Sequence, residues 1–427
     1  MGRRARAGLR PGHGSRMSRR CSLRVLGALA AVLALGLPPL SNGAQALTDK
    51  VTTGLPFVQT DAPEVLAAVK VAPADRVYVM DSAFMHIADS RINVFDRRDG
   101  RFLGFVSTGF NGQMLLSMDG QTIYDVTTYF SRLTRGERTD VVEAYDAHTL
   151  RFLREIRIPD KRASVLNYKG VLRLSGNGQF LLEQNATPAV SVTVVDLQAH
   201  RFVNEVTATA GCWDIIPLPG TARSFATICG DGSLLWIELG EDGKVVAQQR
   251  SRPMFSVAED PVFACAAVGK DALAFVSFNG IVHGARLDRA RHAFTFVPKW
   301  PLVQDASDRA AGWVPGGVNL VAMDAATDRL YVLMHPHGKE GSQGQPAQEI
   351  WVFDMGTHRR VARVPADGAV SMTLDRADPQ VPRLLTIDGN NVRVYDISAP
   401  APVLMRTIKA AAEASVQVEP GIPPGTE

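Results

Sequence analysis

The chain has 427 residues, of which 46% are hydrophobic and 21% are charged, with a formal net charge of +3. Eight arginines and no acidic residue fall within residues 1–46, so the rest of the chain, with 38 basic and 43 acidic residues, has a net charge of −5. This balance excludes a protein that binds nucleic acid through a basic face.

Residues 1–46 are typical of a secretory signal peptide. The arginine-rich start is followed by an apolar stretch at 25–37, which is too short to span a bilayer, and by the small-residue pattern Ala-Gln-Ala at 44–46. Met17 is an alternative start, and Ser-Arg-Arg at 18–20 leaves a twin-arginine signal open. No later stretch reaches the roughly 18 apolar residues of a membrane span, so we expect an exported chain with no membrane anchor.

A strand–turn–strand pattern recurs along the rest of the chain. The copies lie at 92–106, 141–156, 192–206, 350–364 and 392–408, with degenerate copies at 234–248 and 282–296. In each clear copy an apolar strand ends in an aspartate and a polar turn leads to a second strand. Another candidate strand precedes each copy, and most repeats are 40 to 50 residues long, which is typical of a four-stranded propeller blade.

These repeats predict an all-β fold, a seven-bladed β-propeller of four-stranded antiparallel blades over residues 47–418, followed by a disordered tail at 419–427. Blades that are apolar on both faces can bury them only by packing around an axis. The ring must also close, and we expect either 47–71 or 415–418 to supply an outer strand that completes the last blade. An insertion at 298–318 contains a helix-compatible stretch at 302–312.

Three segments carry side chains that could contact a ligand or a partner. Phe84 and Met85 follow the first candidate strand in a loop, and they could form either a contact site or a small satellite core beneath that loop. The charged segment 135–140 could be a solvated hairpin tip or a polar rim that docks a partner. The pair His335 and His337 lacks a nearby third ligand, which favours a solvated loop over a metal site.

Four cysteines are present, and Cys21 lies in the predicted signal peptide. We expect Cys212 and Cys229 to form a disulfide across neighbouring strands of one blade, because an exported protein meets oxidising conditions; the alternative is two buried thiols. Cys265 lies in an apolar strand pattern and is expected to be a buried free thiol. Without a CxxC pair, zinc-ribbon and redox motifs are excluded, and none of the common nucleophile, phosphate-binding or zinc-protease motifs occurs.

Several longer stretches resemble the heavy subunit of the quinoprotein amine dehydrogenases. They are YVMDSAFMH, TYFSRLTRGERTDVVEAYD, AGCWDIIP, TICGDGSLLWIELGEDGKV, WVPGGVNLV, MHPHGKEG and EIWVFD. The resemblance runs from Pro63 to Val418 and is closer to aromatic amine dehydrogenase than to methylamine dehydrogenase. It implies a periplasmic α2β2 assembly in which this chain is the seven-bladed heavy subunit.

The resemblance also implies a division of labour. A small cysteine-rich light chain carries tryptophan tryptophylquinone, primary amines are oxidised to aldehyde and ammonia, and electrons pass to a blue copper protein such as azurin or amicyanin. Three cysteines beyond the signal peptide are too few for that light chain, so we expect no cofactor, metal or catalytic residue here. Phe84, or Met85 if the alignment slips by one, lines the apolar route to the quinone. The alternative is a stand-alone exported propeller that binds a ligand or partner without redox chemistry.

Overall fold

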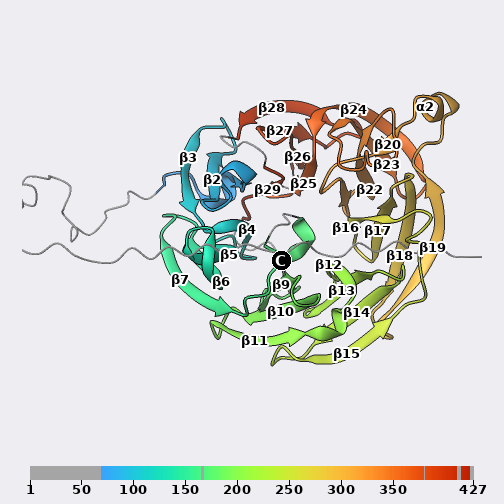
Figure 1. The fold of residues 1–427 in the computed structure, drawn as a ribbon. Helices are drawn as coiled ribbons and strands as arrows, with labels where there is room; N and C mark the ends of the chain where they lie inside the picture. Colours follow the sequence, from blue (N-terminus) through green and yellow to red (C-terminus); the bar gives the residue numbers. More distant parts are fainter. Residues whose placement is uncertain (1–68, 165–167, 379, 411–414, 424–427) are drawn as a thin grey trace, which may run out of the picture. The chain divides into compact units, whose positions relative to one another are not determined.

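The computed structural model of the chain describes residues 69–164, 168–378, 380–410 and 415–423, so the predicted signal peptide and most of the first candidate closing segment lie outside the described residues. In the described part, seven antiparallel sheets form a ring (Figure 1). The prediction of an all-β, seven-bladed β-propeller is therefore confirmed. We number the sheets as blades 1 to 7 in chain order, and the strands of each from the axis outwards.

The first four blades have four strands each. Blade 1 contains β29 (Gln417–Pro420), β1 (Arg76–Asp81), β2 (Arg91–Asp96) and β3 (Phe102–Ser107). Blade 2 contains β4 (Phe110–Leu116), β5 (Thr122–Arg132), β6 (Arg135–Asp146) and β7 (Phe152–Ile158). Blade 3 contains β8 (Leu172–Leu174), β9 (Phe180–Asn185), β10 (Ser191–Asp196) and β11 (Arg201–Val206). Blade 4 contains β12 (Cys212–Pro217), β13 (Ser224–Cys229), β14 (Leu234–Leu239) and β15 (Val245–Arg250).

The last three blades include the insertion. Blade 5 contains β16 (Val262–Val268), β17 (Ala272–Ser277), β18 (Ile281–Asp288) and β19 (Ala293–Pro301). Blade 6 has five strands, β20 (Val314–Pro315), β21 (Val321–Asp324), β22 (Arg329–His335), β23 (Ala347–Asp354) and β24 (Arg359–Ala369). Blade 7 contains β25 (Ser371–Asp375), β26 (Arg383–Ile387), β27 (Asn391–Asp396) and β28 (Val403–Lys409). The described helices are η1 (Pro73–Asp75), η2 (Phe84–His86), η3 (Lys169–Val171), η4 (Thr207–Thr209) and α2 (Ala306–Ala310).

The recurring aspartates stabilise the turn between the third and fourth strands. Asp146 Oδ1 accepts a hydrogen bond from the backbone N–H of Thr149 at 2.7 Å, and Asp354 Oδ1 does the same for Thr357 at 2.7 Å. These bonds satisfy N–H groups that the strand ladder leaves unpaired, and those from Thr357 lower the pKa of Asp354. The aspartates that identify the repeat therefore stabilise turns, and the repeat gives no sign of a reactive site.

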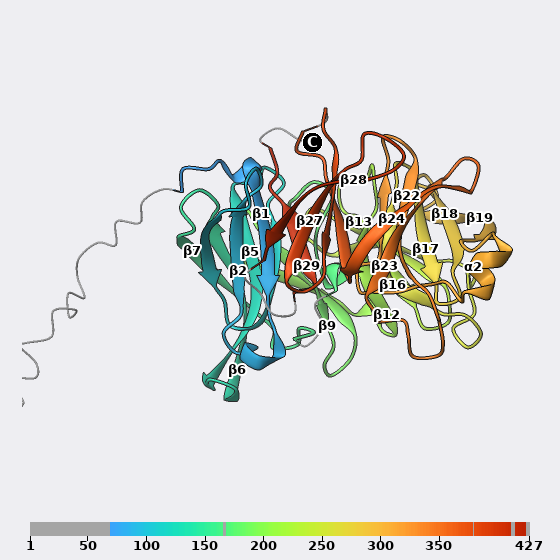
Figure 2. The ribbon, with the colours of Figure 1, turned by 90° about the horizontal axis from the view of Figure 1, so that it is seen from above.

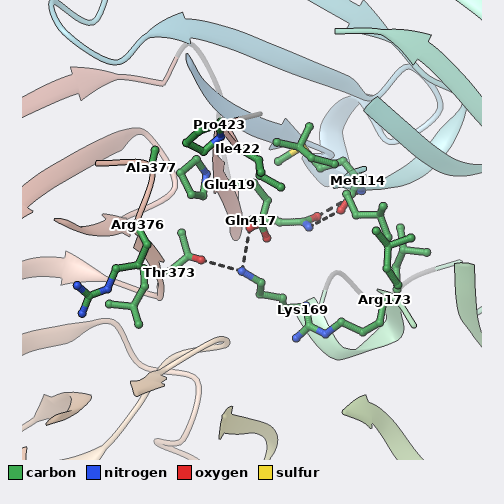
Figure 3. Close-up of a pocket in the computed structure, with 17 residues that line it drawn as sticks. Met114, Lys169, Arg173, Thr373, Arg376, Ala377, Gln417, Glu419, Ile422 and Pro423 are labelled. Carbon is green, nitrogen blue, oxygen red and sulfur yellow. Dashed lines mark hydrogen bonds and ion pairs between the residues drawn. The ribbon is translucent and has the colours of Figure 1, made fainter. Parts of the chain in front are cut away.

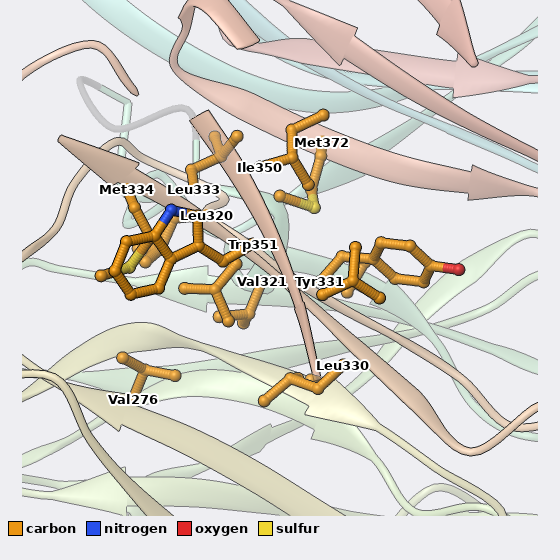
Figure 4. Close-up of a cluster of buried hydrophobic side chains, with 14 of the residues drawn as sticks. Val276, Leu320, Val321, Leu330, Tyr331, Leu333, Met334, Ile350, Trp351 and Met372 are labelled. Atoms are coloured by element: carbon orange, nitrogen blue, oxygen red, sulfur yellow. The ribbon is translucent and has the colours of Figure 1, made fainter. Parts of the chain in front are cut away.

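Neighbouring blades pack face to face through apolar side chains. The largest cluster fills the space between blades 5, 6 and 7 and includes Val276, Trp351 and Met372 (Figure 4). Trp351 and Tyr331 are fully buried there. Since both faces of a blade are covered in this way, second strands such as β17 and β22 consist of nearly continuous apolar residues, as buried strands do.

The ring is closed by the C-terminal strand β29, which confirms one of the two candidate segments. β29 pairs with β1, with Val418 opposite Val79. The expectation that the closing strand would be an outer strand was wrong: β1 is already the second strand of blade 1, so the missing strand is the axial one. The ordered chain also continues beyond the expected boundary at 418, because β29 ends at Pro420 and Ile422 packs against the cluster between blades 1 and 2.

The insertion before blade 6 contains the short helix α2, inside the helix-compatible stretch 302–312. Two arginines of β24 hold it: Arg360 contacts Asp308 at 2.6 Å and Arg363 contacts the same carboxylate at 3.0 Å. The guanidinium of Arg360 also lies 4.2 Å from the ring centre of Trp351. The extra strand β20 in blade 6 was not expected from the repeat.

The two ends of the ring differ in what they expose. One end carries the connections between the second and third strands of the blades, including η2 and the tip of the β5–β6 hairpin, and we call it the η2 face (Figure 2). The inner strands start at this face and β29 ends at the opposite one, which we call the C-terminal face. Within the described residues, no helix has the length and apolar character needed to cross a membrane.

Candidate functional site

The η2 helix presents Phe84 and Met85 to solvent, and each side chain is 85% exposed. The alternative in which both residues pack beneath their loop as a satellite core is wrong. His86 and Asp81 face each other across the loop, with 3.5 Å between His86 Nε2 and Asp81 Oδ1, and the Asn111 N–H donates to the carbonyl oxygen of Ile87 at 2.7 Å. The loop is therefore tied to blade 2 while its two largest apolar side chains point outwards.

The β5–β6 hairpin projects from the same face, beside η2 (Figure 2). Its tip carries Leu133, which is 72% exposed, between Arg132 and Arg135. At its base Arg138 makes two hydrogen bonds to Asp140, at 2.8 and 2.7 Å. The charged segment 135–140 is thus one arm of a long hairpin, with an apolar residue at the tip and an ion pair where the hairpin meets the blade.

A buried arginine connects this hairpin to the inner strand β4 of blade 2 and to β9 of blade 3. The fully buried Arg162 donates to Thr128 Oγ1 at 3.0 Å and to the carbonyl oxygen of Asn111 at 2.7 Å, and it lies 3.5 Å from Glu183. Burial raises the pKa of Glu183 to about 8, against the opposing charge of Arg162. Because such an arginine has fixed partners on three elements, it holds the hairpin at one angle to the ring.

Carboxyl groups are also buried between the strands of the hairpin. Tyr129 and Tyr145 donate to Glu143 at 2.9 and 2.8 Å. Burial raises the pKa of Glu143. Burial, followed by the charge of Glu143, raises the pKa of Asp125 well above its usual range. These contacts make the lower part of the hairpin rigid, and they leave only its tip to adapt to another surface.

The disulfide between Cys212 and Cys229 is present in blade 4, as expected. The two residues face each other across β12 and β13, next to the η2-face connection between β13 and β14. Cys265 is free and buried, as expected, and burial raises the pKa of its thiol to about 12. A thiol with this pKa carries almost no thiolate near neutral pH, which makes it unreactive.

The histidine pair is only partly a solvated loop. His335 is buried and its Nδ1 lies 3.0 Å from the carbonyl oxygen of Pro336, whereas His337 is exposed. Among the residues that the structure describes, no group of three or more His, Cys, Asp or Glu side chains is arranged to hold a metal ion.

The fold and its exposed residues define a class: a seven-bladed β-propeller whose η2 face exposes apolar side chains beside a long hairpin. The family model of the methylamine dehydrogenase heavy chain (MADH) matches residues 73–410. The chain therefore belongs to the methylamine dehydrogenase heavy chain family, which confirms the resemblance to quinoprotein amine dehydrogenase heavy subunits.

Individual relatives agree with this assignment. The chain is 29% identical over 314 residues to the methylamine dehydrogenase heavy chain of Methylobacillus flagellatus, covering 72% of this chain and 76% of the relative. It is 28% identical over 368 residues to that of Methylorubrum extorquens, covering 84% and 87%. The periplasmic gluconolactonase PpgL of Pseudomonas aeruginosa superposes with a TM-score of 0.56 at 12% identity, covering 81% of this chain and 98% of that chain, and this similarity shows the fold alone.

Proposed function

We propose that this chain is the heavy subunit of a periplasmic α2β2 amine dehydrogenase that oxidises primary amines, with a preference for aromatic ones, to aldehyde and ammonia. Family membership is the observation that carries the proposal. The leader-like residues 1–46 support export. The motifs DSAFMH and MHPHGKEG support the aromatic preference over the methylamine preference.

The light chain is proposed to bind at the η2 face. Two adjacent apolar side chains that are each 85% exposed leave a large apolar surface in water, and such surfaces mark contact sites. Leu133 at the tip of the β5–β6 hairpin adds a second apolar contact on the same side. A light chain that contacts η2 and the hairpin tip would bury these exposed apolar side chains. The rigid hairpin would fix its orientation on the η2 face.

The role of this chain in the reaction is to form part of the route by which the amine reaches the quinone. Tryptophan tryptophylquinone on the light chain supplies the oxidising power, and the electrons leave to a blue copper protein such as azurin or amicyanin. Phe84 and Met85 carry no titratable group, so they fit the wall of a substrate route. They would contact the hydrocarbon part of the amine and exclude water from the reacting centre.

Co-expression tests this function. The full chain is expressed with and without a short cysteine-rich light chain of an amine dehydrogenase from the same host, and the products are compared by visible absorption and by amine-dependent reduction of azurin and amicyanin. We expect quinone absorbance and amine oxidation only in the co-purified complex, with 2-phenylethylamine preferred over methylamine. Amine oxidation by the isolated chain would refute a purely supporting role. Failure to bind any light chain would favour a stand-alone propeller.

A further inference from the structure

The axial channel of the ring is crossed by η3. This short helix belongs to the connection into blade 3, yet the backbone N–H of Lys169 donates to Oδ1 of Asn319, between β20 and β21 of blade 6, at 2.9 Å. Lys169 Nζ donates to Thr373 Oγ1 of blade 7 at 2.7 Å and to Glu419 Oε2 of blade 1 at 2.9 Å (Figure 3). Blades on several sides of the axis therefore hold η3 in place through Lys169.

A pocket of about 400 Å³ lies in this channel. It is lined by the inner strands β4, β8, β25 and β29 and by residues 421–423, where the chain leaves β29 at the C-terminal face. A pocket of this volume takes a small organic molecule. It lies in the axis of the ring, away from Phe84 and Met85, which are on the η2 face.

The pocket contains one cation without a direct partner. Lys169 is paired with Glu419, and Arg376 is paired with Asp324 and points away from the other lining side chains (Figure 3). Arg173 has no hydrogen bond or ion pair to any residue in the described part of the chain, and its side chain lies beside that of Lys169 at one edge of the lining residues (Figure 3). Burial lowers the pKa of Arg173. The negative charges of Asp214 and Glu419 act in the opposite direction, but they do so at longer range than an ion pair.

The remaining wall is apolar. It is formed mainly by aliphatic side chains of three blades and of the C-terminal segment, Leu116, Leu172, Leu174, Leu374 and Ile422. Arg173 is half-buried, and an anionic partner can offset the free-energy cost of the water contacts that its guanidinium loses there. The pairing of one unpartnered guanidinium with aliphatic walls matches a ligand that has a single negative charge and an apolar body.

We propose that the axial pocket binds a small organic carboxylate, with its carboxylate on Arg173 and its hydrocarbon part against the leucine wall. An amine is a poor candidate, because Arg173 and Lys169 would repel its cation. Inorganic phosphate is a poor candidate too, because it would leave the leucine wall in contact with water. The site goes beyond the proposed amine oxidation and does not depend on the light chain.

Calorimetric titration of the full chain, alone and in the complex, tests the proposal. The probes are benzoate, its neutral isostere benzamide, acetate, which lacks the apolar body, and inorganic phosphate. We expect benzoate to bind at least tenfold more tightly than each of the other three. Equal binding of benzamide would overturn the role of charge, and equal binding of acetate or phosphate would overturn the role of the apolar wall. Absence of benzoate binding would overturn the site.

Two variants locate the binding within the pocket. Arg173→Gln should weaken benzoate binding at least tenfold, whereas Arg151→Gln, on the outer surface, should leave it unchanged. If Arg173→Gln does not fold, Ile422→Glu serves instead, because it adds a repelling charge to the pocket wall without removing the guanidinium. Unchanged benzoate affinity in a folded Arg173→Gln or Ile422→Glu variant would refute the assignment. Since binding is measured without turnover, either result leaves the amine dehydrogenase proposal to its own test.

Discussion

Phe84 and Met85 differ from the apolar residues around them in being exposed to solvent. Within the same connection Ala83 is buried, while Phe84 and Met85 lie in water. The sequence could identify this loop by its motif, but it could not show whether the loop covers its own apolar residues. That outcome depends on the contact between His86 and Asp81 and on the bond from Asn111, which is distant in the sequence.

Shortening Phe84 tests its place in the substrate route. In the complex, Phe84→Ala should lower kcat/KM for 2-phenylethylamine about tenfold relative to methylamine, because the larger amine loses more apolar contact. The measurement is the ratio of the two kcat/KM values. Phe102→Ala, on the outer strand β3, is the matched control and should leave the ratio unchanged. A constant ratio in Phe84→Ala would show that this side chain lies outside the route.

The disulfide is expected to stabilise blade 4 rather than to react. Replacing Cys212 and Cys229 by alanine should lower the free energy of unfolding by about 3 kcal/mol, since the closed loop spans 17 positions. Denaturant unfolding under oxidising conditions measures this change. Cys265→Ala is the control, with a smaller effect from its lost packing. An equal loss in both variants would mean that packing, rather than the crosslink, accounts for the difference.

Asp214 makes the stability of the chain depend on pH. Burial raises its pKa to about 7, against the charge of Arg173. The folded chain therefore holds this proton more tightly than the unfolded chain, and its stability falls as pH rises from about 4 to about 7. Asp214→Asn removes this titration. The free energy of unfolding of the variant should therefore exceed that of the parent by an amount that grows from about pH 4 to about pH 7 and reaches about 4 kcal/mol at most.

Thermal unfolding at several pH values measures this difference. Asp242→Asn, in an exposed turn, is the control. The hydrogen bonds from Lys244 lower the pKa of Asp242, so this variant should show no gain that grows with pH. A constant difference between Asp214→Asn and the parent from pH 5 to pH 8 would contradict the assignment of this titration to Asp214.

At the scale of the elements, the strands that recur were predictable and the elements that occur once were not. The hairpins and their aspartates follow from a local pattern of alternating residues and turns. The two-residue strand β20 arises where the insertion returns to blade 6, and no repeat predicts it. The position of η3 across the axis depends on Asn319, Thr373 and Glu419, which lie 150, 204 and 250 residues further along the chain.

Ring closure is the element-scale contact with the clearest test. Val418 of β29 is buried with Val77, Val79 and Leu385 between blades 1 and 7. Val418→Asp places a carboxylate in this cluster and should lower the free energy of unfolding by about 4 kcal/mol. Val403→Asp, on the outer strand β28, is the control and should cost less than 1 kcal/mol, as exposed substitutions do. Chemical denaturation measures both, and similar losses would argue against closure by β29.

At the scale of the whole molecule, the number of blades could be counted in the sequence because each blade carries the same signal. The η2 face and the axial pocket could not be derived in the same way. Phe84 and Leu133 lie in different blades, and Arg173 lines the pocket from a strand of only three residues. Such sites are defined by the ring as a whole, and the sequence offered only the resemblance to indicate a partner.

The light-chain contact gives a prediction at this scale. Leu133→Asp places a charge at the apolar tip of the β5–β6 hairpin and should weaken light-chain binding at least tenfold, because the tip must lose water on docking. Size-exclusion chromatography over a range of concentrations measures the dissociation of the complex. Leu153→Asp, on the outer strand β7, should bind as the parent does. Equal affinity in both variants would place the light chain away from the hairpin.

Closure by β29 has a consequence for how the protein is made. Residues 417–420 leave the ribosome after every other described strand, whereas their partner β1 is the first described strand to leave it. Throughout translation the edge of β1 has no neighbour on its axial side, and such an edge invites pairing with other chains. Any product cut short before Gln417 would keep this open edge permanently, so we expect such products to aggregate more readily than the full chain.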